Sequence, residues 1–148
     1  MICTWTGISK DVKEHLQIAH KELCEDYNDQ KSLLLPSSNA YTNTYKLLFA
    51  YNEIFSYRLL IQHGIMYVGL NYIGLARNDS KYQYKFMVMN NECTEGVVVT
   101  KLARSFTETE DDLFFPKDCL KLHCDYTERF RNEQGGLTVS LEILRVFE

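Results

Sequence analysis

The amino-acid sequence predicts a mainly β protein, an antiparallel eight-stranded β-sandwich preceded by a short helix. Short apolar or alternating segments recur after residue 30, and polar or glycine-containing turns separate them. Ten Tyr and eight Phe supply side chains that suit half-buried pleated surfaces. Because no helical segments alternate with the strand-like ones, a parallel α/β sheet is not expected.

The helix is expected near the N-terminus, at 9–22. Ser9 is a suitable N-cap, and Asp11 lies where a negative charge interacts favourably with the helix dipole. Apolar residues then recur at helical spacing: Val12, Leu16, Ala19 and Leu23. This is the one helical pattern that the sequence indicates.

Eight segments that follow the turn signal Tyr27-Asn28-Asp29 are predicted to be strands. Their ranges are 33–35, 45–51, 55–62, 65–73, 82–89, 96–103, 120–124 and 137–147. His63-Gly64 predicts a tight hairpin between two of them, because glycine readily adopts the positive φ that such a turn needs. Segment 107–119, in which an acidic run precedes Leu-Phe-Phe-Pro, is instead expected to form a turn or a short 3₁₀ piece across an end of the sandwich.

Composition and charge narrow the classes of partner. A chain of 148 residues with 45% apolar residues can bury a core as one domain. Its formal net charge of -4 argues against general binding to nucleic acid or to an anionic membrane, and no apolar run has the roughly 18 residues of a membrane span. Five cysteines without a regular framework favour reduced thiols and an intracellular location, cytoplasmic or also nuclear.

The sequence carries no common catalytic signature. It lacks G-x-S-x-G, a phosphate-binding glycine-rich loop and H-E-x-x-H. His63 and His123 are interpreted as structural histidines, and the acidic residues of 108–112 as a solvated loop. We therefore expect that the chain is not catalytic on its own, and that its partner is a protein or a small ligand.

Cys3, His15 and His20 have the C-x11-H-x4-H spacing of the second half of a zinc finger. A structural zinc site normally has four ligands, and only Met1 and Ile2 stand where the first cysteine is expected. Two histidines five positions apart lie about 140° apart around an ideal helix. They can therefore bind one metal ion only if the last helical turn is distorted.

Four passages carry a resemblance to a known family. They are CTWTGISKDVKEHLQIAHK, FSYRLLIQHGIMYVGLNYIG, YQYKFMVMNNE, and KDCLKLHCDY followed by FRNEQGGLTVSLEIL. In order and spacing they resemble the second zinc finger and the TRAF-like β-sandwich of the seven in absentia (Siah/SINA) family of E3 ubiquitin ligases. The resemblance implies a partial SIAH-type zinc finger at 1–23 and a SINA/TRAF-like sandwich at 24–148, although 24–54 and 104–117 match poorly.

By this resemblance, the chain is a substrate-recognition or adaptor module of the ubiquitin-proteasome pathway. It would bind an extended peptide of a degron-bearing substrate by strand addition. The implied peptide-binding residues are Tyr45, Leu47, Phe49 and Ser140. Leu47 stands where the family has Trp, and Ser140 where it has Asn. The sequence has neither a RING nor a first finger, so it does not resemble a complete ligase.

Two alternatives stay open. The chain could be a RING-less dimerising interaction protein without peptide recognition, which competes with or regulates a full ligase. For either function, the resemblance implies a homodimer or a heterodimer with a full-length family member. In the finger, Cys3, His15 and His20 could hold zinc with water or Cys24 as the fourth ligand. Otherwise Val12, Leu16 and Leu23 pack the helix onto the sandwich with no metal. If Met1 is the natural start, the missing thiolate should weaken zinc binding; a longer protein would supply it.

Overall fold

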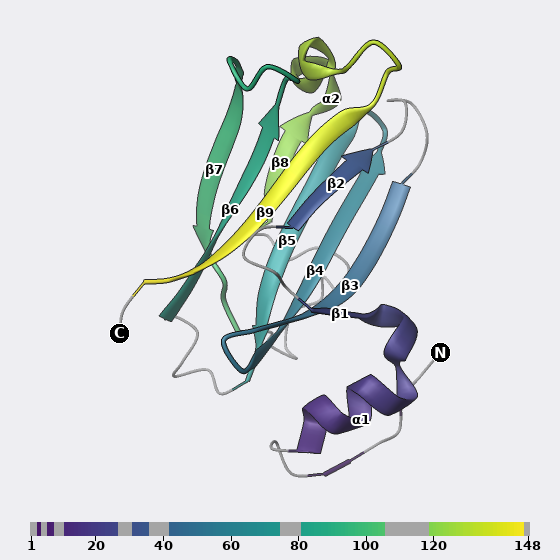
Figure 1. Ribbon diagram of the computed structural model, residues 1–148, viewed down its shortest axis with the longest axis vertical. Helices are drawn as coiled ribbons and strands as arrows, with labels where there is room; N and C mark the ends of the chain where they lie inside the picture. Colours follow the sequence, from purple (N-terminus) through teal and green to yellow (C-terminus); the bar gives the residue numbers. More distant parts are fainter. Residues whose placement is uncertain are drawn as a thin grey trace.

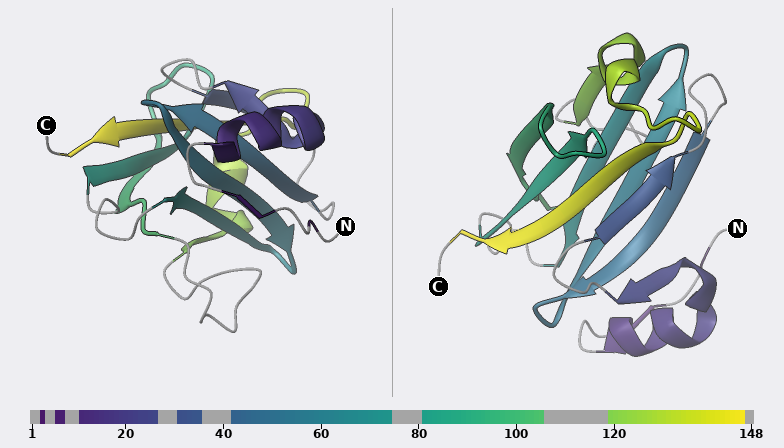
Figure 2. Two further views of the ribbon diagram at one scale, coloured as in Figure 1. Left: turned by 90° about the horizontal axis from the view of Figure 1, so that it is seen from below. Right: turned by 45° about the horizontal axis from the view of Figure 1, so that its top comes forward.

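The computed structural model describes residues 3, 6–7, 11–26, 31–35, 42–74, 81–105 and 119–146. Two β-sheets pack face to face, and the helix α1 (Val12–Ala19) lies at one end of them, as Figures 1 and 2 show. This confirms the predicted mainly β sandwich preceded by a short helix. The 3₁₀ turn η2 (Lys21–Leu23) links α1 to the first strand.

All eight predicted strands are present, each within a few residues of its predicted range. They are β2 (Lys31–Leu35), β3 (Thr42–Ala50), β4 (Glu53–Gln62), β5 (Ile65–Ile73), β6 (Tyr82–Met89), β7 (Gly96–Leu102), β8 (Leu120–His123) and β9 (Leu137–Arg145). One sheet has the order β1-β3-β4-β5-β8, and the other has the order β2-β9-β6-β7. Every neighbouring pair among these eight strands is antiparallel.

Two features differ from the prediction. A ninth strand, β1 (Cys24–Asp26), pairs in parallel with Leu47–Phe49 of β3, so the sandwich is neither eight-stranded nor wholly antiparallel. Its sequence, Cys-Glu-Asp, lacks the β-branched and aromatic residues that indicate a strand. In addition, the chain leaves β8 at His123 and forms two short turns, α2 (Cys124–Thr127) and η4 (Glu128–Phe130). The segment predicted to be a turn or a short 3₁₀ piece is 107–119, and all of it except residue 119 lies outside the described residues.

Two-residue turns join β3, β4 and β5. His63 and Gly64 have φ of 54° and 76°, which confirms the tight hairpin between β4 and β5. Tyr51 and Asn52 form the corresponding turn between β3 and β4, with φ of 54° and 58°. The sequence did not indicate this second turn, because a tyrosine at positive φ is uncommon.

The core lies between the inner faces of the two sheets. Alternate residues of β3, β4, β5, β6 and β9 supply most of it, and the most deeply buried include Leu48, Phe55, Leu59, Val68, Phe86, Val88, Leu137 and Val139. A second buried layer covers the outer face of the five-stranded sheet, where Leu47, Phe49, Ile54 and Leu60 are each less than 9% exposed. Strand β4 is therefore buried on both faces.

Tyr51 ties the two sheets together at one end of the sandwich. Its hydroxyl donates to the carbonyl oxygen of Ile143 on β9 at 2.8 Å. Its ring lies 5.8 Å from that of Tyr82 on β6, and the guanidinium of Arg145 lies 4.9 Å from the ring centroid. These contacts hold a turn residue whose left-handed backbone is otherwise unfavourable.

We expect Tyr51→Phe to lower the free energy of unfolding by about 1 kcal/mol, because it removes the inter-sheet hydrogen bond and keeps the ring. Urea denaturation measures the change. Tyr126→Phe is the matched control, since the described contacts of Tyr126 are ring contacts with Phe130 and Arg129. Equal stability of Tyr51→Phe and the wild type would show that this bond contributes nothing.

Candidate functional site

The structure brings Cys3, His15 and His20 together. Their ligand atoms all lie within 4.8 Å of one another, and Cys3 Sγ lies 3.4 Å from His15 Nε2. Zinc bonds of about 2.3 Å to sulfur and 2.0–2.1 Å to nitrogen place two tetrahedral ligands about 3.5 Å apart. The Cys3–His15 pair therefore already has the separation of two ligands on one ion.

His20 reaches the group because the helix ends one residue before it. Helix α1 stops at Ala19, and His20 has φ of -129° and ψ of 38°, outside the helical region. Its ring centroid lies 5.2 Å from that of His15. This is the distorted last turn that the two histidines were predicted to need.

The described residues supply three ligand atoms to this group, which we call the metal group. Cys24 does not join it; its thiol donates to the carbonyl oxygens of Leu16 at 3.4 Å and His20 at 3.3 Å. Cys3 is exposed and the two histidines are half-buried, so water has access to the remaining coordination positions. The metal group can hold a metal ion, but as an incomplete and exposed site.

Apolar packing does not bury helix α1. None of its side chains is buried: Val12 and Leu16 are half-buried, and Ile18 is 75% exposed. Leu23, which was predicted to pack with them, is also half-buried. Among the described contacts with the sandwich, the ammonium of Lys13 lies 5.3 Å from the ring centroid of Phe49. Because a short helix depends on tertiary contacts for its stability, apolar packing alone does not fully account for the position of α1.

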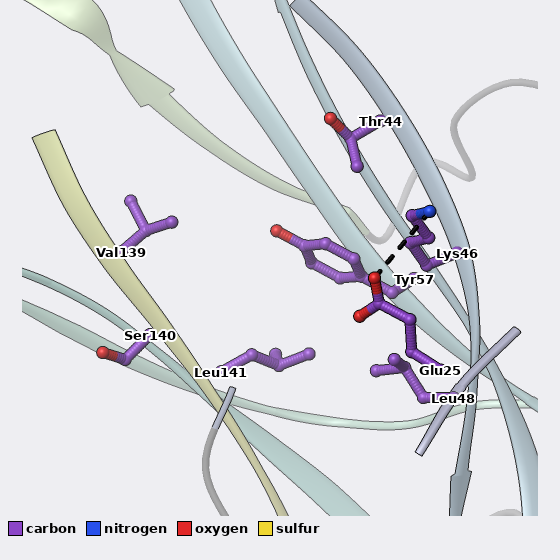
Figure 3. A pocket seen from close by; sticks show the side chains of 8 residues that line it. All are labelled: Glu25, Thr44, Lys46, Leu48, Tyr57, Val139, Ser140 and Leu141. Atoms are coloured by element: carbon purple, nitrogen blue, oxygen red, sulfur yellow. Dashed lines mark ion pairs between the residues drawn. The ribbon is translucent and has the colours of Figure 1, made fainter. Parts of the chain in front are cut away.

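A small pocket, which we call the edge pocket, opens between the two sheets. Its volume is about 60 Å³, and it is lined by Glu25, Thr44, Lys46, Leu48, Tyr57, Val139, Ser140 and Leu141. Figure 3 shows the β9 residues on one side and Glu25, Lys46 and Leu48 on the other, with the Tyr57 ring between them. The pocket is much smaller than a typical small-molecule site, but its apolar interior and polar margin could receive one small side chain.

Charged groups from two strands meet beside the edge pocket. Lys46 Nζ lies 3.8 Å from Glu25 Oε1 and donates to the carbonyl oxygen of Glu22 at 3.2 Å. Burial raises the pKa of Tyr57 above its ordinary value, because a phenolate would lose hydration there. Any tyrosine hydroxyl is protonated at neutral pH and can donate a hydrogen bond; burial keeps the Tyr57 hydroxyl protonated above pH 10 as well.

The predicted peptide-binding residues divide between two surfaces. Tyr45, Leu47 and Phe49 share one face of β3, as their spacing predicted, and this is the outer face of the five-stranded sheet. Tyr45 is 42% exposed there, while Leu47 and Phe49 are buried. Ser140 lines the edge pocket instead, although its hydroxyl points away from the other labelled side chains in Figure 3. The described structure therefore does not bring Ser140 together with the other three.

Of the residues that line the edge pocket, the sequence analysis named only Ser140 as a binding residue, and Thr44, Lys46 and Glu25 are among those that it missed. Thr44 and Lys46 alternate in phase with the core residue Leu48, so two polar side chains stand at inward positions of a strand. These polar residues at core-facing positions are the feature of the sequence that could have indicated a pocket. No such feature indicated Glu25, because β1 itself was not predicted.

A second, more open hollow lies between the segment of α1 and η2 and the sandwich. It has a volume of about 240 Å³ and is lined by Gln17, Lys21, Cys24, Glu25 and Phe49. Glu25 lines both this hollow and the edge pocket. The residues around β1 are therefore the junction between the metal group and the sandwich.

No model of a protein family matches this chain, and neither does any curated protein sequence at a significant level. In the part of the chain that the structure describes, no helix has the length and apolar character needed to cross a membrane. The resemblance to the Siah/SINA family thus rests on the sequence passages alone.

The raised pKa of Tyr57 predicts how stability depends on pH. The unfolded chain releases the Tyr57 hydroxyl proton near pH 10, whereas the folded chain keeps it. The contribution of Tyr57 to the free energy of unfolding is therefore present below pH 10 and is lost as the pH rises further. The free energy of unfolding, measured by urea denaturation between pH 9 and 11.5, should fall as the pH rises. Above pH 10 this fall should be smaller in Tyr57→Phe than in the wild type, by about 1.4 kcal/mol per pH unit. Parallel slopes would contradict this account of Tyr57.

Proposed function

We propose that this chain is a SINA-type protein-recognition module that binds an extended peptide segment at the sandwich edge beside β3. The observation that carries the proposal is the edge pocket, an apolar hollow between the sheets with Glu25 and Lys46 at its margin. Its role is recognition rather than catalysis. In the ubiquitin-proteasome pathway, such a module would select degron-bearing substrates.

The edge of β3 supports binding by strand addition. Strand β4 covers one side of β3 along its length, whereas β1 covers only Leu47–Phe49 on the other side. Among the described strands, none pairs with Thr44–Lys46 on that second side, and these residues adjoin the edge pocket. A peptide strand placed there would form backbone hydrogen bonds and direct alternate side chains toward the pocket.

The size of the edge pocket limits the side chain that it accepts. A volume of about 60 Å³ suits a small aliphatic group and is too small for an aromatic ring. Leu48, Val139 and Leu141 would contact that group. The carboxylate of Glu25 and the ammonium of Lys46 would contact the peptide backbone or its polar side chains.

Selection of linear peptides from a phage-displayed random library tests this function. We expect wild-type protein to enrich extended peptides, and Thr44→Trp to weaken their binding at least tenfold, because the indole would block the mouth of the pocket. Thr100→Trp is the matched control, because Thr100 is an exposed strand residue on the other sheet. Substitutions of the buried Leu47 or Phe49 would disturb the fold and are less informative. Equal binding by both variants, or no enrichment, would count against the proposal.

The ion proposed for the metal group is zinc, because structural zinc sites use Cys sulfur and His nitrogen as ligands. Cys3, His15 and His20 would hold it, and their present separations support this assignment. The ion would act as a structural link between the segment around Cys3 and the end of α1. Such a link would compensate for the incomplete burial of the helix.

Metal content by native mass spectrometry, on protein purified without added zinc, tests this assignment. We expect one zinc ion per chain, and a lower melting temperature after a chelator removes it. His15→Ala should abolish zinc uptake, whereas Cys93→Ser, which changes an exposed thiol outside the metal group, should leave it intact. Absence of zinc together with an unchanged melting curve would show that the finger is held by packing alone.

A further inference from the structure

Strand β1 lies between the metal group and the edge pocket. It has three residues, and its pairing with β3 is the one parallel pair among the described strands. Parallel pairing is slightly less stable per residue than antiparallel pairing, and three residues form few backbone bonds. Among the elements of the five-stranded sheet, β1 is therefore the one whose docking depends most on side-chain contacts.

The contacts on one side join β1 to the metal group. The Cys24 thiol donates to the carbonyl oxygens of Leu16 and His20, at 3.4 and 3.3 Å. The backbone N–H of Leu23 also donates to the carbonyl oxygen of His20, at 3.0 Å. His20 is itself a member of the metal group, so the position of its backbone affects both the ligand geometry and the start of β1.

The contacts on the other side join β1 to the edge pocket. Lys46 on β3 donates to the carbonyl oxygen of Glu22 and pairs with the carboxylate of Glu25. Glu25 lines the pocket together with Lys46, and its side chain is 29% exposed. Docking of β1 on β3 therefore completes one wall of the pocket.

From these two sets of contacts we propose that β1 couples the metal group to the edge pocket. A metal ion on His15 and His20 fixes the end of α1, which holds Cys24 and stabilises β1 on β3 with Glu25 at the pocket wall. Without the ion, β1 separates from β3 more often, and the wall is incomplete for part of the time. The consequence for peptides rests on the proposed function: metal tightens peptide binding, and by linkage the peptide tightens metal binding by the same factor.

Hydrogen exchange tests the coupling without any peptide. We expect zinc to slow exchange at least tenfold in 21–26 and to slow it in 44–50, the partner segment on β3. Lys46→Met, which keeps the aliphatic stem and lies away from the metal group, should still bind zinc but lose most of this slowing. Glu22→Ala is the control, because it keeps the backbone carbonyl that accepts from Lys46.

Cys24→Ala tests the link on the helix side. It removes the thiol contacts with Leu16 and His20 but changes no residue that lines the edge pocket. We expect zinc to slow exchange in 21–26 much less than in the wild type, and Cys93→Ala to behave as the wild type. Zinc uptake without slower exchange in wild-type protein, or no zinc uptake, would overturn the coupling.

A peptide enriched by the wild-type protein then gives the second readout. Its dissociation constant should be about tenfold lower with zinc than with chelator in the wild type, and equal under both conditions in Cys24→Ala. If the wild-type protein has the same dissociation constant for the peptide with zinc and with chelator, the coupling is overturned even if zinc slows hydrogen exchange. If no peptide is enriched, the proposed function fails, while the exchange measurements still decide whether metal binding orders β1.

Discussion

The burial of β4 on both faces is the constraint on which the rest of the structure depends. Its inner residues, such as Phe55 and Leu59, meet the second sheet, while its outer residues Ile54 and Leu60 are buried on the opposite side. A strand of this kind needs cover on each face, because exposed apolar surface is unfavourable in water. The sandwich supplies one cover. Leu47 and Phe49 of the neighbouring β3 lie on the same outer face as Ile54 and Leu60 and are buried with them.

The strands could be predicted because each carries its own local signal. Alternation in 82–89 and 137–145, and the nearly continuous apolar run of 53–62, indicate strands without reference to any other segment. Strand β1 lacks such a signal, since Cys24-Glu25-Asp26 is extended only because β3 offers it an edge. The Tyr51–Asn52 turn is of the same kind. Contacts with Ile143, Tyr82 and Arg145, all distant in sequence, stabilise its unusual backbone.

The two candidate sites differ in how far the sequence predicted them. The metal group follows from spacing, because a short helix fixes the relation of His15 to His20 and leaves only its last turn uncertain. The edge pocket does not, because both faces of β3 are apolar near its end. Leu47 and Phe49 alternate with Leu48 and Ala50, so periodicity cannot tell which pair meets the other sheet. Only the pairing with β4 and the position of β9 decide that Thr44 and Lys46 face the pocket.

Strand β1 differs from the other strands because its own sequence does not indicate a strand. Elements with a strong pattern of their own form the rigid body of the sandwich, and an element without one adopts the conformation that its neighbours permit. Cys24 contacts the carbonyl oxygens of Leu16 in helix α1 and of His20, a member of the metal group, while Glu25, the next residue, contacts Lys46 at the pocket. Since the two contacts are made by adjacent residues, the proposed coupling needs only a displacement of β1 itself to connect the metal group with the pocket. The proposal is consistent with this feature of β1: its sequence does not itself favour a strand, so its pairing with β3 can depend on what the metal group and the edge pocket bind.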